Sequence, residues 1–355
     1  MAPDTAEAAQ PSTYDKCPGA KSVVYPDSAD FLRMLASHPT TMLPLLIITT
    51  IVYVVILSLS TKMLRNAAKI RDEQIRSDLY LCLSTPIVVS SICLQGMFIP
   101  RSVAGMSTIS LAYVMFAVWR CVSLLFRMYG DSENMSELMI QSDIRLPLHS
   151  IPLCCCPCLP SLEPTVEKID TLKFFVLQTP VVRMICVVLI NTIKVESYCE
   201  TTLATKILSW GGLASTLIAV YSSSIFVKMS NDHLRRYHLD VLIKCTNLTQ
   251  FMYNVLRMAV DQTAMAPVFL NDIVFDDGTL IEARVQADFW YNALLIFTLA
   301  LIAFSLNSNI RPGKSALFDI EPSPLAGRQP IIGATRNCLP FYGATELANE
   351  ETILI

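Results

Sequence analysis

The sequence predicts an all-α membrane protein with seven transmembrane helices, an external amino terminus and a cytosolic carboxyl terminus. Of its 355 residues, 53% are hydrophobic and only 16% are charged, whereas a soluble domain carries about 25% charged residues. A bilayer core about 30 Å thick requires about 20 mostly apolar residues per crossing helix, and seven segments meet this requirement. Lysine and arginine gather in alternate connecting segments, and their distribution predicts the orientation.

The predicted spans, in chain order, are Thr41–Thr61, Leu79–Ile99, Val103–Phe126, Lys173–Ile193, Ile207–Val227, Leu239–Val260 and Asp288–Leu306. The first contains no charged residue. Only three residues separate the second span from the third, so we expect these two to form an antiparallel hairpin. The sixth is the most polar. If it does not cross the membrane, the chain has six spans and both termini face the same side.

The spans divide the chain into three regions. We expect residues 1–40 to be an extracellular segment without a cleavable signal peptide, because they contain several acidic residues and no basic start followed by an apolar stretch. Residues 41–306 form the transmembrane domain, with a cysteine-rich cytosolic loop at 127–172. The proline-, glycine- and polar-rich tail at 307–355 is expected to be disordered.

The orientation follows from the cations near the span ends. Thirteen lysines and arginines lie in one set of connecting segments and five in the opposite set. The cation-rich set includes the segment after the first span, with Lys62, Arg65 and Lys69. This side is therefore predicted to be cytosolic.

The cysteine run Cys154, Cys155, Cys156 and Cys158 then lies in the cytosol, where thiols stay reduced. A disulfide knot is disfavoured there, and a zinc site normally needs two separated pairs of ligands, so we expect no metal. We predict S-palmitoylation, because apolar residues flank the run and acylation favours cysteines held near the inner leaflet. The alternative is an unmodified, proline-stiffened loop.

Two other cysteines, Cys17 and Cys199, are the ones predicted to lie outside. They could form one disulfide that ties the amino-terminal segment to the loop after the fourth span, or remain free thiols. The cysteines within the spans are expected to be small apolar residues.

Several function classes lack their sequence signatures. A G-protein-coupled receptor usually has a cysteine at the outer end of its third span and Asp/Glu-Arg-Tyr at the inner end. Here the inner end has Phe126, Arg127 and Met128. Common hydrolase, metalloprotease and nucleotide-binding motifs are missing as well. We therefore expect neither a receptor nor an enzyme, and no cofactor or nucleic-acid partner.

Polar residues within the spans are the candidate binding residues, because charges in hydrocarbon normally face a cavity or a partner. Relative to Lys244, the sixth-span residues Asn247, Gln250, Asn254, Arg257 and Asp261 fall within an arc of about 80° on a helix. This stripe either lines a solute path or joins the helix to a neighbour by interhelical hydrogen bonds. In the fourth span, Arg183 lies near the centre and Gln178 lies five residues before it.

The sign of these charges favours an anionic solute. Arg183, Lys244 and Arg257 have no evident acidic partner in the spans, whereas Arg120 and Lys173 lie near the inner boundary and are expected to extend toward the headgroups. An amphipathic organic anion would satisfy both the cations and the apolar walls. The candidate substrate-binding residues are Gln178, Arg183, Lys244, Asn247, Gln250, Asn254 and Arg257.

Several motifs follow one another in a characteristic order. They are the run from Pro152 to Pro160 that contains the four cysteines, the sequence Leu-Lys-Phe-Phe-Val-Leu-Gln at 172–178, Tyr221 in the fifth span, and the spacing of Leu239, Lys244 and Gln250 in the sixth. In these features the sequence resembles the organic solute transporter alpha family, over roughly Pro44 to Pro312.

The resemblance implies a seven-span facilitative carrier of bile acids, steroid conjugates and related lipid-like anions in the plasma membrane, with endomembranes as the alternative site. It also implies a single-span beta-type subunit as a partner, besides membrane lipids and a homo-oligomer. The alternative function is a non-transporting membrane scaffold that regulates protein trafficking.

Overall fold

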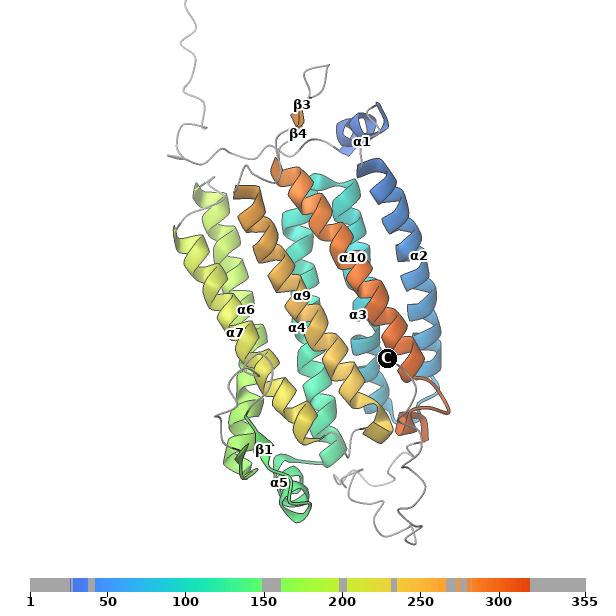
Figure 1. Cartoon of the computed structure of the whole chain (residues 1–355), viewed down its shortest axis with the longest axis vertical. Helices are drawn as coiled ribbons and strands as arrows, with labels where there is room; N and C mark the ends of the chain where they lie inside the picture. The colour runs from blue at the N-terminus through green and yellow to red at the C-terminus, as the bar shows by residue number, and fades with distance from the viewer. Residues whose placement is uncertain are drawn as a thin grey trace, which may run out of the picture.

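The protein is a bundle of long helices that run roughly along one axis in the computed structural model (Figure 1). The structure describes residues 26, 28–37, 42–148, 161–197, 203–230, 235–265, 273–274, 280–281 and 283–319. Within these residues the long helices are α2 (Met42–Ala67), α3 (Glu73–Phe98), α4 (Val103–Tyr129), α6 (Val166–Ser197), α7 (Leu203–Met229), α9 (Leu239–Met265) and α10 (Ala283–Asn309).

Short elements lie at the two ends of the bundle (Figure 1). They are the helices α1 (Ser28–Ser37) and α5 (Ser132–Gln141), the 3-10 turns η2 (Pro100–Ser102), η4 (Arg235–Tyr237) and η5 (Ala316–Asp319), and the antiparallel strand pairs β1 (Leu146–Pro147) with β2 (Ser161–Leu162) and β3 (Ile273–Val274) with β4 (Leu280–Ile281).

Each predicted span overlaps one long helix, so the helical membrane fold is confirmed. Six of these helices are long and apolar enough to cross a bilayer; α9 is not apolar enough, because of its polar residues. Seven crossings and the orientation therefore stay predictions. The outer surface fits lipid contact: Ile51 of α2, Phe174 of α6 and Leu301 of α10 are 60%, 62% and 74% exposed, as expected for side chains that face acyl chains.

The helix ends differ from the predicted spans. α6 begins at Val166, and α5 forms where the sequence predicted only loop. α10 runs on to Asn309, and the following residues pack back on the bundle: Leu317 is buried and the Ser315 hydroxyl donates to the Tyr237 carbonyl at 2.7 Å. Residues 307–319, which were expected to begin a disordered tail, are therefore ordered. Both cysteine predictions lie outside the described residues, since they concern positions 154–158, 17 and 199.

Local sequence explains where the helices start and stop. The Asp72 carboxylate accepts the backbone N–H groups of Gln74 and Ile75, both at 2.9 Å, and so caps the start of α3. α4 ends at Gly130, whose φ of 89° suits a residue without a side chain.

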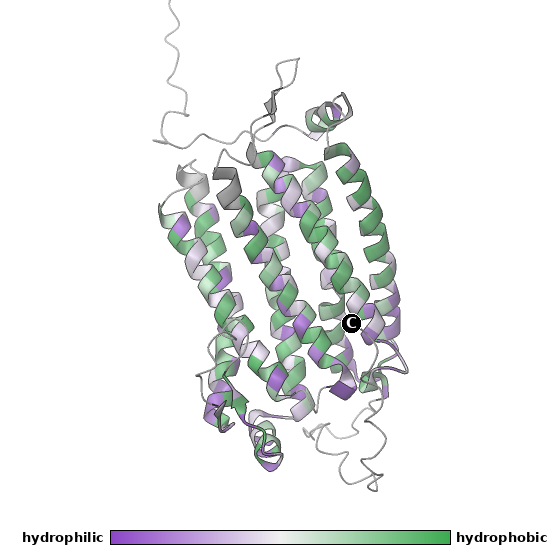
Figure 2. Ribbon diagram, in the orientation of Figure 1, coloured by the Kyte–Doolittle hydropathy of each residue, from purple (hydrophilic) through white to green (hydrophobic). Residues whose placement is uncertain are grey.

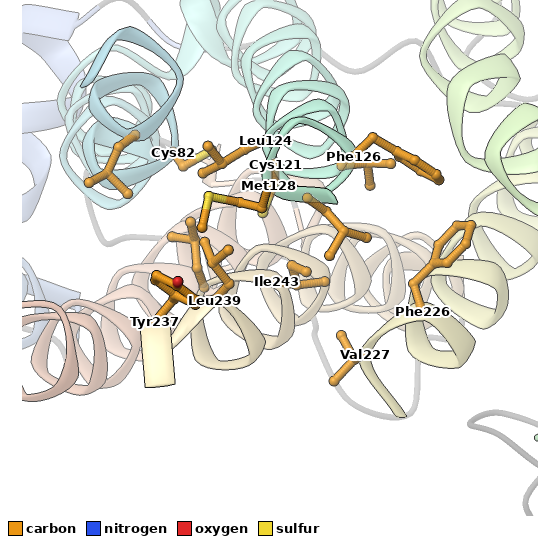
Figure 3. Packing of buried hydrophobic residues seen from close by; sticks show 14 of the residues in the cluster. Cys82, Cys121, Leu124, Phe126, Met128, Phe226, Val227, Tyr237, Leu239 and Ile243 are labelled. Carbon is orange, nitrogen blue, oxygen red and sulfur yellow. The ribbon is translucent and has the colours of Figure 1, made fainter. Parts of the chain in front are cut away.

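The core consists of two apolar clusters, one toward each end of the bundle. The first, near the ends of α2 and α4, joins all seven long helices, including Leu172 of α6 and Phe226 of α7. Figure 3 shows part of it, with Phe126 of α4 against Phe226 at a ring-centroid distance of 5.3 Å. The second cluster contains buried residues of α1, α2, α3, α4, α9 and α10; among the described residues only Val187 of α6, and none of α7, packs against it.

A buried carboxylate binds two arginines at the end of the bundle where Lys62, Arg65 and Lys69 lie, which we call the cation-rich end. Asp78 of α3 is 1% exposed and pairs with Arg120 and Arg127 of α4 at 3.1 and 3.3 Å. The Arg120 guanidinium also lies 5.2 and 5.1 Å from the ring centroids of Phe116 and Trp119. The expectation that Arg120 only extends toward headgroups is therefore wrong, because Asp78 lies immediately before the second predicted span and was not counted as its partner.

We predict that Asp78→Asn lowers the midpoint of thermal unfolding in detergent by about 3–8 °C, because two half-buried arginines lose their counter-charge. The matched control is Asp240→Asn, which removes the pair with the exposed Lys244 on the same helix and should shift the midpoint by less than about 2 °C. Equal shifts for the two variants would show that the Asp78 pair contributes no special stability.

Candidate functional site

The polar stripe of α9 faces the interior of the bundle. Asn247 is buried and donates from Nδ2 to the Ser223 hydroxyl of α7 at 2.7 Å. Gln250 is fully buried, with Nε2 at 3.6 Å from the Met115 sulfur of α4. The stripe therefore joins α9 to its neighbours on two sides, which is the interhelical bonding that the sequence left as one of two interpretations.

Arg183 of α6 meets this stripe. Its Nη2 donates to Oδ1 of the Asn254 side chain at 2.6 Å, and Nδ2 of Asn254 donates to the Gln250 carbonyl at 2.7 Å. The Nε and Nη1 atoms of Arg183 are buried without a hydrogen-bond partner, and so is Oε1 of Gln250. Among the described residues, Arg183 has no carboxylate partner, so this buried cation is bonded only to a neutral amide.

A glycine makes room for the guanidinium. A Cβ atom at Gly212 of α7 would overlap Nη1 of Arg183 and lie about 3 Å from its Cζ and Cδ. The neighbouring Gly211 has open space at the same position. The absence of a side chain at Gly212 therefore lets the guanidinium lie against the backbone of α7, while its other edge reaches α9.

Two of the three candidate cations, Arg257 and Lys244, have acidic partners, so the expectation that all three lack them is wrong for these two. Arg257 pairs with the buried Asp288 of α10 at 2.8 Å, and its guanidinium lies 5.7 Å from the Tyr291 ring centroid. Lys244 pairs with Asp240 one turn earlier at 3.0 Å and has a side chain that is 61% exposed. Lys244 thus lies outside the buried network, whereas Arg183 is its centre.

Gln178 and Asp261 are the polar residues that remain to be placed. Gln178 lies half-buried on α6, and no hydrogen bond or ion pair joins it to the stripe within the described residues. The side chain of Asp261 lies outside the described part of the chain. Thr179, one turn before Arg183, bonds α6 to α7: its hydroxyl donates to the Ser215 carbonyl at 3.1 Å.

Two small cavities adjoin the Arg257–Asp288 pair. One is lined by Gly96, Tyr253, Tyr291 and Asn292 among others, and the next by Gly96 and Asp288 among others; each has a volume of about 10 Å³. This is room for about one water molecule. Nδ2 of Asn292 is buried there without a partner. These cavities are too small for an organic solute, so the bundle is closed around this part of the polar network.

No metal site occurs in the part of the chain that the structure describes, because no three His, Cys, Asp or Glu residues are grouped to hold an ion. The arrangement offers instead a buried guanidinium with two unused donor nitrogens beside the amides of α9. Such a fork matches the oxygens of a carboxylate, sulfate or phosphate group.

The family model and the similar proteins found by comparison point to the same family. The family model described as Organic solute transporter Ostalpha matches residues 44–307. The organic solute transporter alpha-like protein 1 of Caenorhabditis elegans is 25% identical over 254 residues, which cover 71% of this chain and 65% of that protein, just under two thirds of its length. The alpha-like protein 2 of the same organism is 25% identical over 251 residues, 70% of this chain and 72% of that protein. No solved structure matches.

The two glycines of α7 allow a matched test of the Arg183 position. Gly211→Ala should raise the midpoint of thermal unfolding by about 1–3 °C, because alanine favours a helix by about 0.5–1 kcal/mol over glycine. Gly212→Ala should lower the midpoint by a similar amount, because it displaces the guanidinium from Asn254.

In an Arg183→Ala background the two glycine substitutions should behave alike, since no guanidinium remains to be displaced. A Gly212→Ala penalty that persists in this background would place the clash elsewhere and contradict the assigned packing.

Proposed function

Since the chain belongs to the organic solute transporter Ostalpha family, we propose that it carries amphipathic organic anions, such as steroid conjugates, across the membrane with Arg183 as the residue that contacts the anionic group. This family is one of transporters and not of enzymes. The six apolar helices agree with a multi-pass membrane protein. In the proposal α9 also crosses the membrane, which makes seven spans, the cation-rich end is cytosolic, and the plasma membrane is the location.

The observation that carries the proposal is the charge of Arg183. A buried cation is costly unless it is paired, and the single amide of Asn254 leaves the positive charge uncompensated. An incoming sulfate or carboxylate would supply the missing charge and accept from Nε and Nη1, which have no partner. The solute would then take the role that Asp288 has for Arg257.

Aromatic and apolar side chains beside Arg183 suit the body of such a solute. Tyr253 precedes Asn254 on α9 and lies edge-to-face with Tyr291 at a centroid distance of 5.9 Å. A steroid-like ring system packs well on aromatic faces and the apolar walls of a bundle. Amphipathic anions therefore fit this site better than small hydrophilic ones.

Because the described part of the bundle is closed around this portion of the polar network, with cavities of about 10 Å³, transport requires some helices to move. The α6–α7 pair is attached unequally along its length: at the cation-rich end it belongs to the first apolar cluster (Figure 3), whereas at the other end almost none of it joins the second cluster. There it is held by polar bonds, from Arg183 to Asn254 and from Asn191 to Thr108 at 3.0 Å.

A solute anion can take the place of Asn254 as the acceptor for Arg183, whereas it cannot take the place of an apolar contact. We therefore assign the opening to the α6–α7 pair, which pivots on the first cluster and separates from α4 and α9 at the opposite end. The Thr179–Ser215 bonds keep α6 and α7 together during this movement.

Uptake of a radiolabelled steroid sulfate into cells tests the binding residue. Arg183→Gln should lower uptake per surface protein about tenfold or more, because a charge-assisted hydrogen bond is worth about 1.5–3 kcal/mol. Lys244→Gln, which removes a cation that is exposed and paired with Asp240, should leave uptake within about twofold.

The assay is run with and without a co-expressed single-span beta-type subunit. Unchanged uptake in Arg183→Gln would remove Arg183 as the anion contact. Absence of uptake for every anionic steroid, with displaced membrane proteins in cells that lack the chain, would favour the trafficking scaffold instead.

Cross-linking tests the movement. Cysteines at Thr108 and Asn191, bridged by a short reducible methanethiosulfonate linker, should stop uptake, and a reducing agent should restore it, because the bridge joins α4 to α6.

The control bridges Thr179→Cys to Ser215→Cys within the α6–α7 pair and should leave uptake largely unchanged; each single-cysteine variant is assayed beside it. Full uptake with α4 and α6 bridged would contradict an opening between them.

A further inference from the structure

A basic groove lies on the outer surface of α2 at the cation-rich end. It has a volume of about 580 Å³ and is lined by Ser58, Thr61, Lys62, Arg65, Asn66 and Lys69. These residues recur every three or four positions, so they share one face of the helix. Hydrophilic residues are concentrated at this end of α2 (Figure 2).

The cations of this basic groove are not neutralised by any carboxylate in the part of the chain that the structure describes. Among the described residues, Lys62, Arg65 and Lys69 are exposed and form no ion pair with a carboxylate. The nearest acidic residues in the sequence lie at the start of α3. Asp72 caps this helix, and Glu73 lies in its first turn.

The hydroxyls of the groove are already bonded to the backbone. Thr61 donates to the Leu57 carbonyl at 2.7 Å and Ser58 to the Val55 carbonyl at 2.8 Å. The groove therefore offers its donors from three cationic side chains and the Asn66 amide, while the hydroxyl oxygens retain only acceptor capacity. This donor set suits an anion that has many oxygens.

The same helix face becomes apolar immediately beyond the groove. Ile51, Val54 and Val55 are 60%, 56% and 48% exposed, and they continue the line of Ser58, Lys62 and Arg65 at helical spacing. A ligand that follows this face must have acyl chains along α2 and an anionic group at Lys62, Arg65 and Lys69. This combination indicates a lipid and not a free phosphate.

We propose that the basic groove binds the headgroup of a phospholipid that carries more than one phosphate, such as a phosphoinositide. Three unpaired cations exceed the charge of a single phosphodiester, and Arg71 and Arg76 extend the positive region into the start of α3. Clusters of about four to eight lysines and arginines beside a membrane helix are typical of such recognition. The proposal does not depend on the transported solute or on Arg183.

The test measures lipid binding to the full-length chain in phosphatidylcholine nanodiscs that contain a fluorescent phosphatidylinositol bisphosphate. The triple variant Lys62→Gln, Arg65→Gln, Lys69→Gln should weaken binding on the order of 100-fold. The control triple Arg145→Gln, Lys168→Gln, Arg311→Gln removes the same charge at the same end, from two exposed positions and from the half-buried Lys168, and should change binding less than about threefold. Both variants are first checked for an unchanged elution volume and unfolding midpoint.

Phosphatidylserine at equal total charge and soluble inositol phosphate are the competing ligands. Competition only by phosphorylated lipid supports the groove. Equal losses for the two triple variants, equal binding of phosphatidylserine, or full competition by soluble inositol phosphate would each overturn the proposal. The first two outcomes would indicate general electrostatic attraction, and the third a headgroup site that does not use the apolar face of α2.

Discussion

The polar face of α9 determines how the bundle is assembled. Amides and an arginine in a helix that lies among apolar spans cannot face lipid, because each unsatisfied polar group there costs several kcal/mol. The helix must turn this face inward, and the structure does so by packing α9 against α4, α7 and α10. The contacts to Ser223, Met115 and Asp288 all follow from this requirement.

The two half-buried arginines of the interior, Arg183 and Arg257, differ in how they are paired. Arg257 has a carboxylate, an aromatic face and a settled position between α9 and α10. Among the described residues, Arg183 bonds one neutral partner, and the missing side chain at Gly212 makes room for its guanidinium. The first arrangement stabilises the fold, whereas the second keeps a positive charge available inside the bundle. The difference separates a structural ion pair from a candidate site for an anion.

The uneven attachment of α6 and α7 gives the proposed site a route of access. Apolar packing holds the pair where α4 and α7 end, and polar bonds hold it at the other end. A solute anion can replace the Asn254 amide as the acceptor for Arg183, so opening this end does not leave the guanidinium without a hydrogen-bond partner. The small cavities of about 10 Å³ beside the Arg257–Asp288 pair are therefore compatible with a carrier that opens only on one side of the bundle.

Hydrophobic length and helical periodicity were enough to predict the long helices and the inward stripe of Asn247, Gln250 and Asn254. They could not predict partners that come from other helices. Asp288 was recognised only as an acidic residue at a span end, and Asp78 was missed because it lies just outside the apolar window. Nothing in the sequence indicates that Gly212 contacts Arg183, since this contact depends on how α6 packs against α7. The central residue was identified from its type and depth, but its surroundings required the three-dimensional structure.

The central claim is that an uncompensated guanidinium between α6, α7 and α9 receives the anionic group of the solute. The most direct measurement is an experimental structure of the protein with a bound steroid sulfate that carries a heavy-atom label. Sulfate density within hydrogen-bonding distance of the Arg183 guanidinium, with α6 and α7 displaced from α4, is the predicted result. Sulfate bound elsewhere, with Arg183 still bonded to Asn254 in an unchanged bundle, would contradict the account.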